Sequence, residues 1–185
     1  MKKYLILVLI VLLIGALFVG VLAVGPSKPA GKSDIAHLYL YEKTPAELTD
    51  PPTPWEIVEG GAWGKMKYNT SGSTLDFVFN GHGLATGEDY TLIYYPDVEW
   101  PANPWPREGI ICLGDGIVND EGNIHIAGSV NTGDLPTAED AALLGGAKIW
   151  LVLSADVECD VEMFGWNPTE YLFEEEAITF DDTDE

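Results

Sequence analysis

The chain has 185 residues, is 46% hydrophobic, and carries 30 acidic residues against nine lysines and arginines. This apolar content argues against intrinsic disorder and suffices for one ordinary core, so we expect a single globular domain. The formal charge of −21 repels phosphate backbones, which excludes nucleic acid as an expected partner.

The chain begins with an apolar run that contains no charge. Residues 4–24 read YLILVLIVLLIGALFVGVLAV and follow the basic pair Lys2 and Lys3. As a helix this run would span roughly 31 Å, about the thickness of the hydrocarbon core of a bilayer. We expect residues 1–24 to be either a signal peptide, cleaved near residues 21–23, or an N-terminal membrane anchor. Because positive charge precedes the run, either fate places the remainder outside, secreted or on the extracellular face of the cell membrane.

Two polar segments frame the expected domain. Residues 25–34, GPSKPAGKSD, predict a flexible linker, and residues 181–185 predict an acidic tail. Residues 35–180 read as about eight short strands separated by turn residues. The expected strands are 35–41, 62–68, 74–79, 89–95, 109–118, 123–130, 147–154 and part of 170–180.

The strand pattern predicts the fold class. The segment 89–95, DYTLIYY, is apolar on both faces and is therefore expected near the centre of a sheet. Helical character is confined to a short turn at 137–146, where Thr137 is a suitable cap. Many short strands with few helical segments predict an all-β domain, an antiparallel β-sandwich, preceded by one N-terminal hydrophobic helix.

Four segments resemble a known group of proteins. They are FVFNGHGL (77–84), YTLIYYP (90–96), GAKIWLVLS (146–154) and GWNPTEYLFE (165–174). In this order they are similar to an uncharacterised family of exported archaeal and bacterial β-domains, over roughly Trp63 to Phe180. The resemblance implies a secreted or cell-surface β-fold and brings no known activity with it.

Three side chains are candidates for covalent modification. Cys112 and Cys159 are the two cysteines of the chain, and an oxidising compartment favours a disulfide between them. The alternative is two buried free thiols. Asn69, in the sequence Asn-Thr-Ser of an expected exposed hairpin, is a candidate acceptor for N-glycosylation.

Four tryptophans lie in expected loops, most of them beside prolines. An indole face can stack on a sugar ring, and proline would hold such a platform rigid. The alternative, which we favour from the sequence, is that each indole covers an open end of the β-core, because burying tryptophan removes a large apolar area from water. The candidate ligand-binding residues are Trp55, Trp100, Trp105 and Trp166.

The segment GDGIVNDEGN offers oxygen ligands suited to Ca²⁺. Its candidate metal ligands are Asp115, Asn119, Asp120 and Asn123. Their spacing does not match an EF-hand, and a plain hairpin turn is the favoured alternative. The sequence contains no G-x-S-x-G, H-E-x-x-H or P-loop motif, so we expect no enzyme and no cofactor other than Ca²⁺.

We therefore expect a non-enzymatic, exported cell-surface or envelope β-domain with a structural or adhesion role. The alternative function is a carbohydrate-binding module that uses the loop tryptophans, with Ca²⁺ ordering the acidic loops. The expected partners are the membrane, through an uncleaved N-terminal segment, and glycans or other surface proteins.

Overall fold

The computed structural model describes residues 34–45, 55–95, 106–135 and 147–184, all within one compact unit, Ser33–Glu185. This part of the chain is built from strands, with a single short 3-10 turn, η1 (Ser154–Asp156). The expected N-terminal helix and the expected turn at 137–146 lie outside the described residues. No helix in the described ranges has the length and apolar character needed to cross a membrane.

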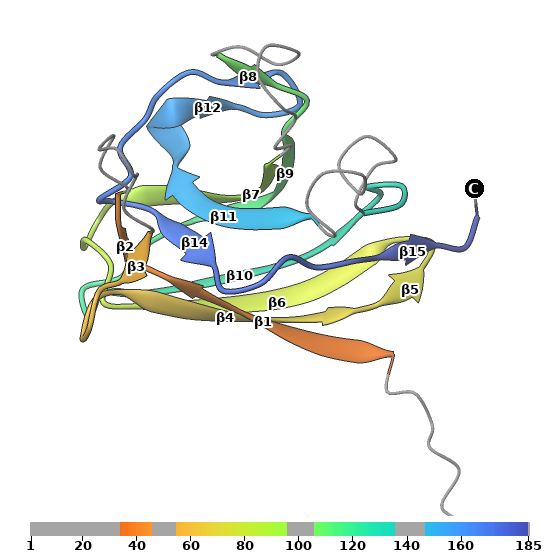
Figure 1. Cartoon of the computed structure of the whole chain (residues 1–185), viewed down its shortest axis with the longest axis horizontal. Helices are drawn as coiled ribbons and strands as arrows, with labels where there is room; N and C mark the ends of the chain where they lie inside the picture. The colour runs from red at the N-terminus through yellow and green to blue at the C-terminus, as the bar shows by residue number, and fades with distance from the viewer. Residues whose placement is uncertain (1–33, 46–54, 96–105, 136–146, 185) are drawn as a thin grey trace, which may run out of the picture. The chain divides into compact units, whose positions relative to one another are not determined.

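Eight antiparallel strands form one large sheet, in the order β10-β6-β4-β1-β14-β11-β7-β9 (Figure 1). The all-β, antiparallel part of the prediction is thus confirmed. The strands are β1 (Ile35–Tyr41), β4 (Trp63–Asn69), β6 (Leu75–His82), β7 (Asp89–Tyr95), β9 (Ile111–Ile117), β10 (Asn123–Val130), β11 (Lys148–Leu153) and β14 (Leu172–Glu174).

The sheet curls into a nearly closed barrel, where the sequence predicted two packed sheets. Its edge strands β9 and β10 follow each other in the chain and lie close together: a Cβ added at Gly114 would lie 2.8 Å from the Ile126 side chain. Curling is possible because glycines face inward at close approaches, as at Gly64 against the Phe79 ring. A β-bulge between Leu92 and Ile93, where β7 pairs with β9, adds local twist.

Alternation along the strands separates two apolar clusters. The inner cluster fills the curl and includes Tyr90, Leu92 and Tyr94 of β7. The outer cluster contains Ile93 and Tyr95 of the same strand. The prediction that DYTLIYY is buried on both faces is confirmed, but β7 lies next to the edge strand β9 rather than at the centre of the sheet.

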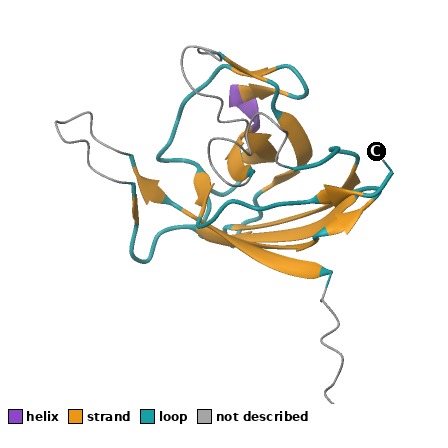
Figure 2. Ribbon diagram, turned by 45° about the vertical axis from the view of Figure 1, so that its right-hand side comes forward, coloured by secondary structure: helices purple, strands orange, loops and turns teal. Residues whose placement is uncertain are grey.

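A small three-stranded sheet lies over the outer cluster on one half of the barrel (Figures 1 and 2). It consists of β8 (Arg107–Glu108), β13 (Glu162–Met163) and β12 (Val157–Glu158). Two further pairs complete the fold, β2 (Lys43–Thr44) with β3 (Glu56–Ile57), and β5 (Ser71–Gly72) with β15 (Asp181–Asp182).

The acidic end of the chain, predicted as a tail, is part of the fold as far as β15. Asp182 is buried, and its backbone N–H donates to Asp134 Oδ1 at 2.7 Å. Residues 181 and 182 pair in parallel with Ser71 and Gly72.

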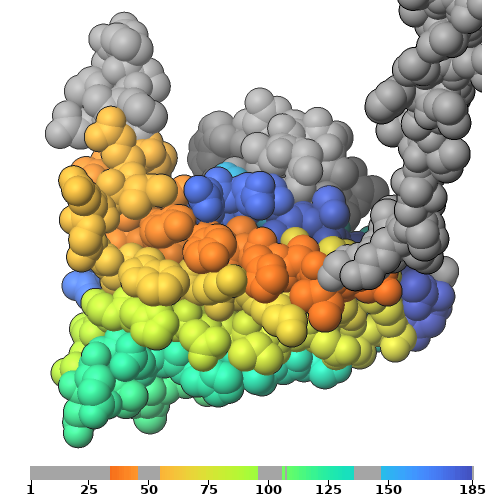
Figure 3. Space-filling model, turned by 90° about the horizontal axis from the view of Figure 1, so that it is seen from below, coloured from red at the N-terminus to blue at the C-terminus, as the bar shows by residue number. Residues whose placement is uncertain are grey.

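On the other half of the barrel, no segment within the described ranges covers the outer face of the sheet. Strands β1, β4, β6 and β10 lie side by side there, and their outward side chains alternate with core residues (Figure 3). We call the outward residues of these four strands the open face. Because the small sheet covers only one half of the barrel, the outer surface of the large sheet forms a second core on that half and is exposed on the other.

Candidate functional site

An aromatic pocket forms where the outer cluster meets solvent. Trp150 of β11 and Phe173 of β14 point outward from adjacent strands and pack edge-to-face, with ring centroids 5.1 Å apart. Tyr95 of β7 stacks on Trp150 at 3.7 Å. Trp55, just before β3, and Trp166, after β13, close over Phe173 with centroid distances of 4.9 and 6.2 Å.

The two loop tryptophans within the described ranges are partly exposed to solvent. Trp55 and Trp166 are 39% and 43% exposed, whereas Trp150 and Phe173 beneath them are 7% and 5% exposed. Trp55 and Trp166 contact each other edge-on at 6.1 Å. They cover part of the second core and still present indole surface to solvent. Trp100 and Trp105 lie outside the described residues, so their predicted role stays a prediction.

The pocket has a volume of about 320 Å³, within the size range of small-ligand sites. Its walls are aromatic and its remaining lining is charged. The lining residues are Lys43, Trp55, Tyr95, Lys148, Trp150, Trp166, Phe173 and Glu174. This combination offers a ligand apolar faces together with hydrogen-bonding and charged groups.

Two buried polar atoms in the pocket lining have unsatisfied hydrogen-bonding capacity. Trp150 Nε1 and Glu174 Oε2 make no hydrogen bond of normal distance and angle, although the indole N–H is near enough to help stabilise the carboxylate charge. Burial raises the pKa of Glu174, and the Lys148 and Lys43 charges offset only part of this rise. Lys43 Nζ donates to the Glu174 carbonyl at 2.6 Å. Both atoms are shielded from solvent, and buried polar atoms without a full hydrogen bond are uncommon.

A buried carboxylate fixes the loop that carries Trp166. Asp156 accepts hydrogen bonds from Tyr171 Oη and from Asn167 Nδ2, the latter at 2.8 Å. Its backbone carbonyl accepts from Phe164 and Gly165 N–H, each at 3.0 Å. Burial and the hydrogen bond to Asp156 raise the pKa of Tyr171. Trp166 is therefore presented on a loop with little conformational freedom.

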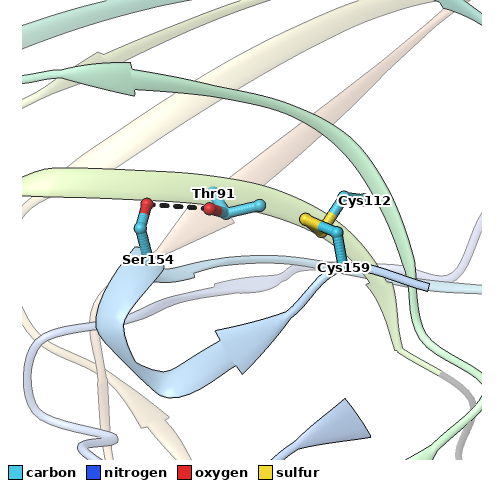
Figure 4. The surroundings of a disulfide bond; sticks show 4 residues. All are labelled: Thr91, Cys112, Ser154 and Cys159. Carbon is cyan, nitrogen blue, oxygen red and sulfur yellow. Dashed lines mark hydrogen bonds between the residues drawn. A yellow bond between two sulfur atoms is a disulfide. The ribbon is translucent and has the colours of Figure 1, made fainter. Parts of the chain in front are cut away.

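The predicted disulfide is confirmed and lies at the edge of the second core. Cys112 of β9 joins Cys159, just after β12, with Cα atoms 5.3 Å apart. Figure 4 shows it near Thr91 and Ser154, whose hydroxyl oxygens are 2.8 Å apart. The covalent link holds the small sheet against the barrel beside the aromatic pocket.

The candidate glycosylation site lies in the hairpin between β4 and β6. Asn69 Nδ2 donates to the carbonyls of Ser71 and Thr74 at 3.0 and 2.9 Å, and its Oδ1 accepts from Asp76 N–H. A glycan on Nδ2 would remove one of these two donors. A second hollow, of about 400 Å³, adjoins this position, but its Asn69 and Asp76 side chains already hold the hairpin.

The candidate calcium ligands occupy the β9–β10 hairpin, mostly in other roles. Asn119 Oδ1 accepts from the N–H groups of Glu121 and Asn123 at 3.1 and 2.9 Å, as a turn-forming residue does. Asn123 Oδ1 pairs with His82 at 2.7 Å. Asp115, on β9, and Asp120, at the turn, are exposed. Within the described ranges, no three His, Cys, Asp or Glu side chains are placed to hold a metal ion together.

Sequence reasoning identified two pocket residues and missed the others. Trp55 and Trp166 are brought together by the fold, as a binding platform requires. The sequence predicts only that Tyr95, Trp150 and Phe173 lie in strands. The apolar character of both faces of these strands was the one indication of an outer cluster. The charged lining at Lys43, Lys148 and Glu174 had no sequence signal.

Comparisons with protein-family models, with curated proteins and with solved structures give no match for this chain. The resemblance to exported β-domains therefore stays a prediction, and the chemistry of the pocket is what indicates a function.

Proposed function

We propose that this protein is a non-enzymatic carbohydrate-binding domain that acts on the outside of the cell. The observation that carries the proposal is the aromatic pocket, in which two half-exposed tryptophans from distant segments stand over charged groups. Sugar rings combine apolar faces, which stack on indoles, with hydroxyls that need hydrogen-bonding partners.

Polar groups of the pocket favour a sugar over a purely apolar ligand. Trp150 Nε1 is a buried donor and Glu174 Oε2 a buried acceptor, and neither makes a hydrogen bond of normal geometry within the protein. Both atoms are shielded from solvent, so sugar hydroxyls would bond the charged groups that line the pocket, Lys43, Lys148 and Glu174. An apolar ligand would cover these groups without bonding them, which is costly.

The structural role predicted from the sequence is the competing function. In that role Trp55 and Trp166 only shield Phe173 and Trp150 from water. Their exposed fractions of 39% and 43% favour binding, because a lid optimised for burial would turn more of its indole surface inward.

An exported location is part of the proposal. The disulfide between Cys112 and Cys159 is consistent with an oxidising compartment outside the cytoplasm. The apolar residues 4–24 supply the expected export signal or anchor. Binding of surface glycans in the pocket would give the exported protein a role in adhesion.

Titration of the full chain with a panel of neutral and acidic oligosaccharides tests the proposal, with tryptophan fluorescence and calorimetry as readouts. We use a detergent without a sugar headgroup to keep residues 4–24 soluble. Trp55→Ala should weaken binding roughly tenfold, equivalent to about 1.4 kcal/mol. Trp55→Tyr, which keeps an aromatic face, should restore most of it.

Ile117→Ala is the matched control, because Ile117 is an exposed apolar residue of β9 that does not line the pocket. It should bind as the unaltered protein does. The lid function would be supported instead if no oligosaccharide bound and Trp55→Ala only lowered the unfolding temperature.

A further inference from the structure

The open face differs in charge from the chain as a whole. Its four strands contain one acidic residue, Asp76, although the chain carries 30 acidic residues. Asp76 lies toward one end of the face, where Ser129 and Thr74 hydroxyls bind its carboxylate. The outward side chains of the face thus carry two lysines, Lys65 and Lys67, against this one carboxylate.

The lysines of the described ranges lie on the open face or line the aromatic pocket. The described ranges contain lysine at positions 43, 65, 67 and 148. Lys65 and Lys67 project from β4 on the open face, and Lys43 and Lys148 line the aromatic pocket. Four of the five basic residues in the described ranges thus lie on the open face or in the pocket, and the fifth, Arg107, lies on β8. Two carboxylates, Glu174 in the pocket and Glu175 near Tyr41, lie between these lysines.

An aromatic row joins the pocket to the open face. Strand register places Trp150 beside Phe173, Phe173 beside Tyr41, Tyr41 beside Trp63, and Trp63 beside His82. The row crosses five adjacent strands at roughly 4.8 Å each, so it extends over roughly 19 Å. Trp63 is 40% exposed and its ring lies 4.7 Å from the His82 ring. The row starts under the tryptophans of the pocket and ends in the open.

A polar row runs beside the aromatic one. Lys65 lies over the Tyr39 ring, with Nζ 5.2 Å from its centroid, and pairs across the strands with Asn80. Asn80 Oδ1 in turn accepts from His125 Nδ1 at 2.8 Å. His82 is held in the same way by Asn123. In both pairs the amide bonds the imidazole at Nδ1, so Nε2 is the ring nitrogen left for an outside hydroxyl.

We propose that the open face binds an extended acidic polysaccharide, a chain of uronate-type sugars that continues from the aromatic pocket across Tyr41, Trp63 and His82. This inference rests on the proposed function and specifies its ligand. Aromatic rings would stack on successive sugar rings, imidazole and amide groups would bond hydroxyls, and Lys65 and Lys67 would pair with carboxylates.

Polar groups of the open face favour this occupant over two others. A nucleic acid and a uronate polymer each carry one negative charge per residue, and the net charge of −21 opposes both, so the imidazole and amide groups, which suit sugar hydroxyls, are what favour the uronate. A second copy of the protein would have to bury Lys65 and Lys67 with an apolar partner surface or find matching acidic residues. The open face is four strands wide, so an extended polymer can lie across it.

Binding of the full chain to polygalacturonate, alginate and hyaluronate tests the inference, in the detergent used above. Each polymer is compared with its short fragments and with its methyl-esterified form, which keeps the sugar shape and removes the charge. We expect the polymer to bind roughly tenfold more tightly than the fragment or the ester. Raising the salt concentration to about 1 M should remove most of this advantage.

Separate variants distinguish failure of the pocket from failure of the open face. Trp63→Ala and Lys65→Gln should abolish the advantage of the polymer and leave fragment binding unchanged. Trp55→Ala should weaken the binding of both, and Ile117→Ala of neither. If fragments bind in a Trp55-dependent way but polymers gain nothing, the further inference fails and the proposed function stands. If polymers depend on Trp63 and not on Trp55, the pocket function fails.

Three other outcomes would overturn the inference. The first is that none of the uronate polymers binds, or that the methyl esters bind as tightly as the acids. The second is that single-stranded oligothymidylate competes as well as the polymers, which would mean that the face selects polyanions rather than sugars. The third is that sedimentation shows a dimer that Trp63→Ala converts to a monomer, which would make the open face an interface between copies.

Discussion

At the scale of single residues, positions around the aromatic pocket are constrained by very local geometry. Gly165 precedes Trp166 and passes so close to Asp156 that a Cβ there would overlap the carboxylate. The carboxylate cannot move aside easily, because Tyr171 and Asn167 both donate to it. The orientation of Trp166 therefore depends on a glycine and an aspartate that do not themselves line the pocket.

Replacing Gly165 by alanine should destabilise the fold by roughly 2–3 kcal/mol, the upper part of the range for overpacking a filled site. Gly116→Ala is the matched control, because its Cβ would meet Ile124 at an ordinary 3.4 Å. Urea unfolding of both variants measures the difference. Equal stability of the two would show that the Trp166 loop relaxes away from Asp156 at little cost.

Glu174 makes the stability of the pocket pH-dependent. Its pKa is raised in the folded state, mainly by burial, so the folded protein holds the Glu174 proton more tightly than the unfolded chain. Stability contributed by this group is therefore full below the ordinary pKa of a glutamate. It falls as the pH rises above that value and is lost above the folded-state pKa.

Glu174→Gln should accordingly raise the unfolding temperature at pH 7 and change it little below about pH 4. Glu176→Gln, which removes the same charge from an exposed position, should show a smaller difference between the two pH values. Thermal unfolding followed by circular dichroism measures both. A lower unfolding temperature for Glu174→Gln at pH 7 would mean that Lys43 and Lys148 outweigh the cost of burial.

At the scale of elements, the small sheet β8-β13-β12 creates the second core by covering only half of the barrel. The disulfide between Cys112 and Cys159 closes a loop of 47 residues between β9 and the end of β12. Strands of two residues contribute few hydrogen bonds, so the covalent link supplies much of the order of this sheet.

Removing the link with Cys112→Ser and Cys159→Ser should lower the free energy of unfolding by about 4 kcal/mol, from the chain entropy of a loop of this length. Reduction of the unaltered protein by dithiothreitol should have the same effect. Denaturant unfolding gives the free energy, and tryptophan emission should shift to the red as Trp150 loses its cover. An unchanged midpoint after reduction would show that packing alone holds the small sheet.

At the scale of the whole molecule, net charge sets the response to ions. A formal charge of −21 on a chain of 185 residues is self-repulsive, and mobile cations screen that repulsion. The lysines on the pocket and open face relieve it only locally.

The unfolding temperature should therefore rise between about 0.05 M and about 1 M salt, equally for NaCl and KCl. CaCl₂ at matched ionic strength separates screening from the predicted calcium site. An equal rise indicates screening alone. A larger rise that Asp120→Asn abolishes would support Ca²⁺ binding by the β9–β10 hairpin, and no rise with NaCl would contradict the electrostatic argument.

Much of the local structure follows from the sequence alone. Strands β1, β7 and β10 match the expected segments residue for residue, because period-two alternation and turn residues are local signals. Two cysteines have only one way to pair with each other, and they do. The charge and the apolar segment 4–24 are properties of composition.

Tertiary structure decided which strands meet and what the exposed aromatics do. Alternating strands look the same whether their inner face packs on a second sheet or on the same sheet curled round, so one barrel-like sheet could not be distinguished from a sandwich. Trp55 and Trp166 become neighbours only through β14 and the buried Asp156 network. The aromatic row across the strands depends on register between segments far apart in the chain, and local sequence carries no information about such long-range pairing.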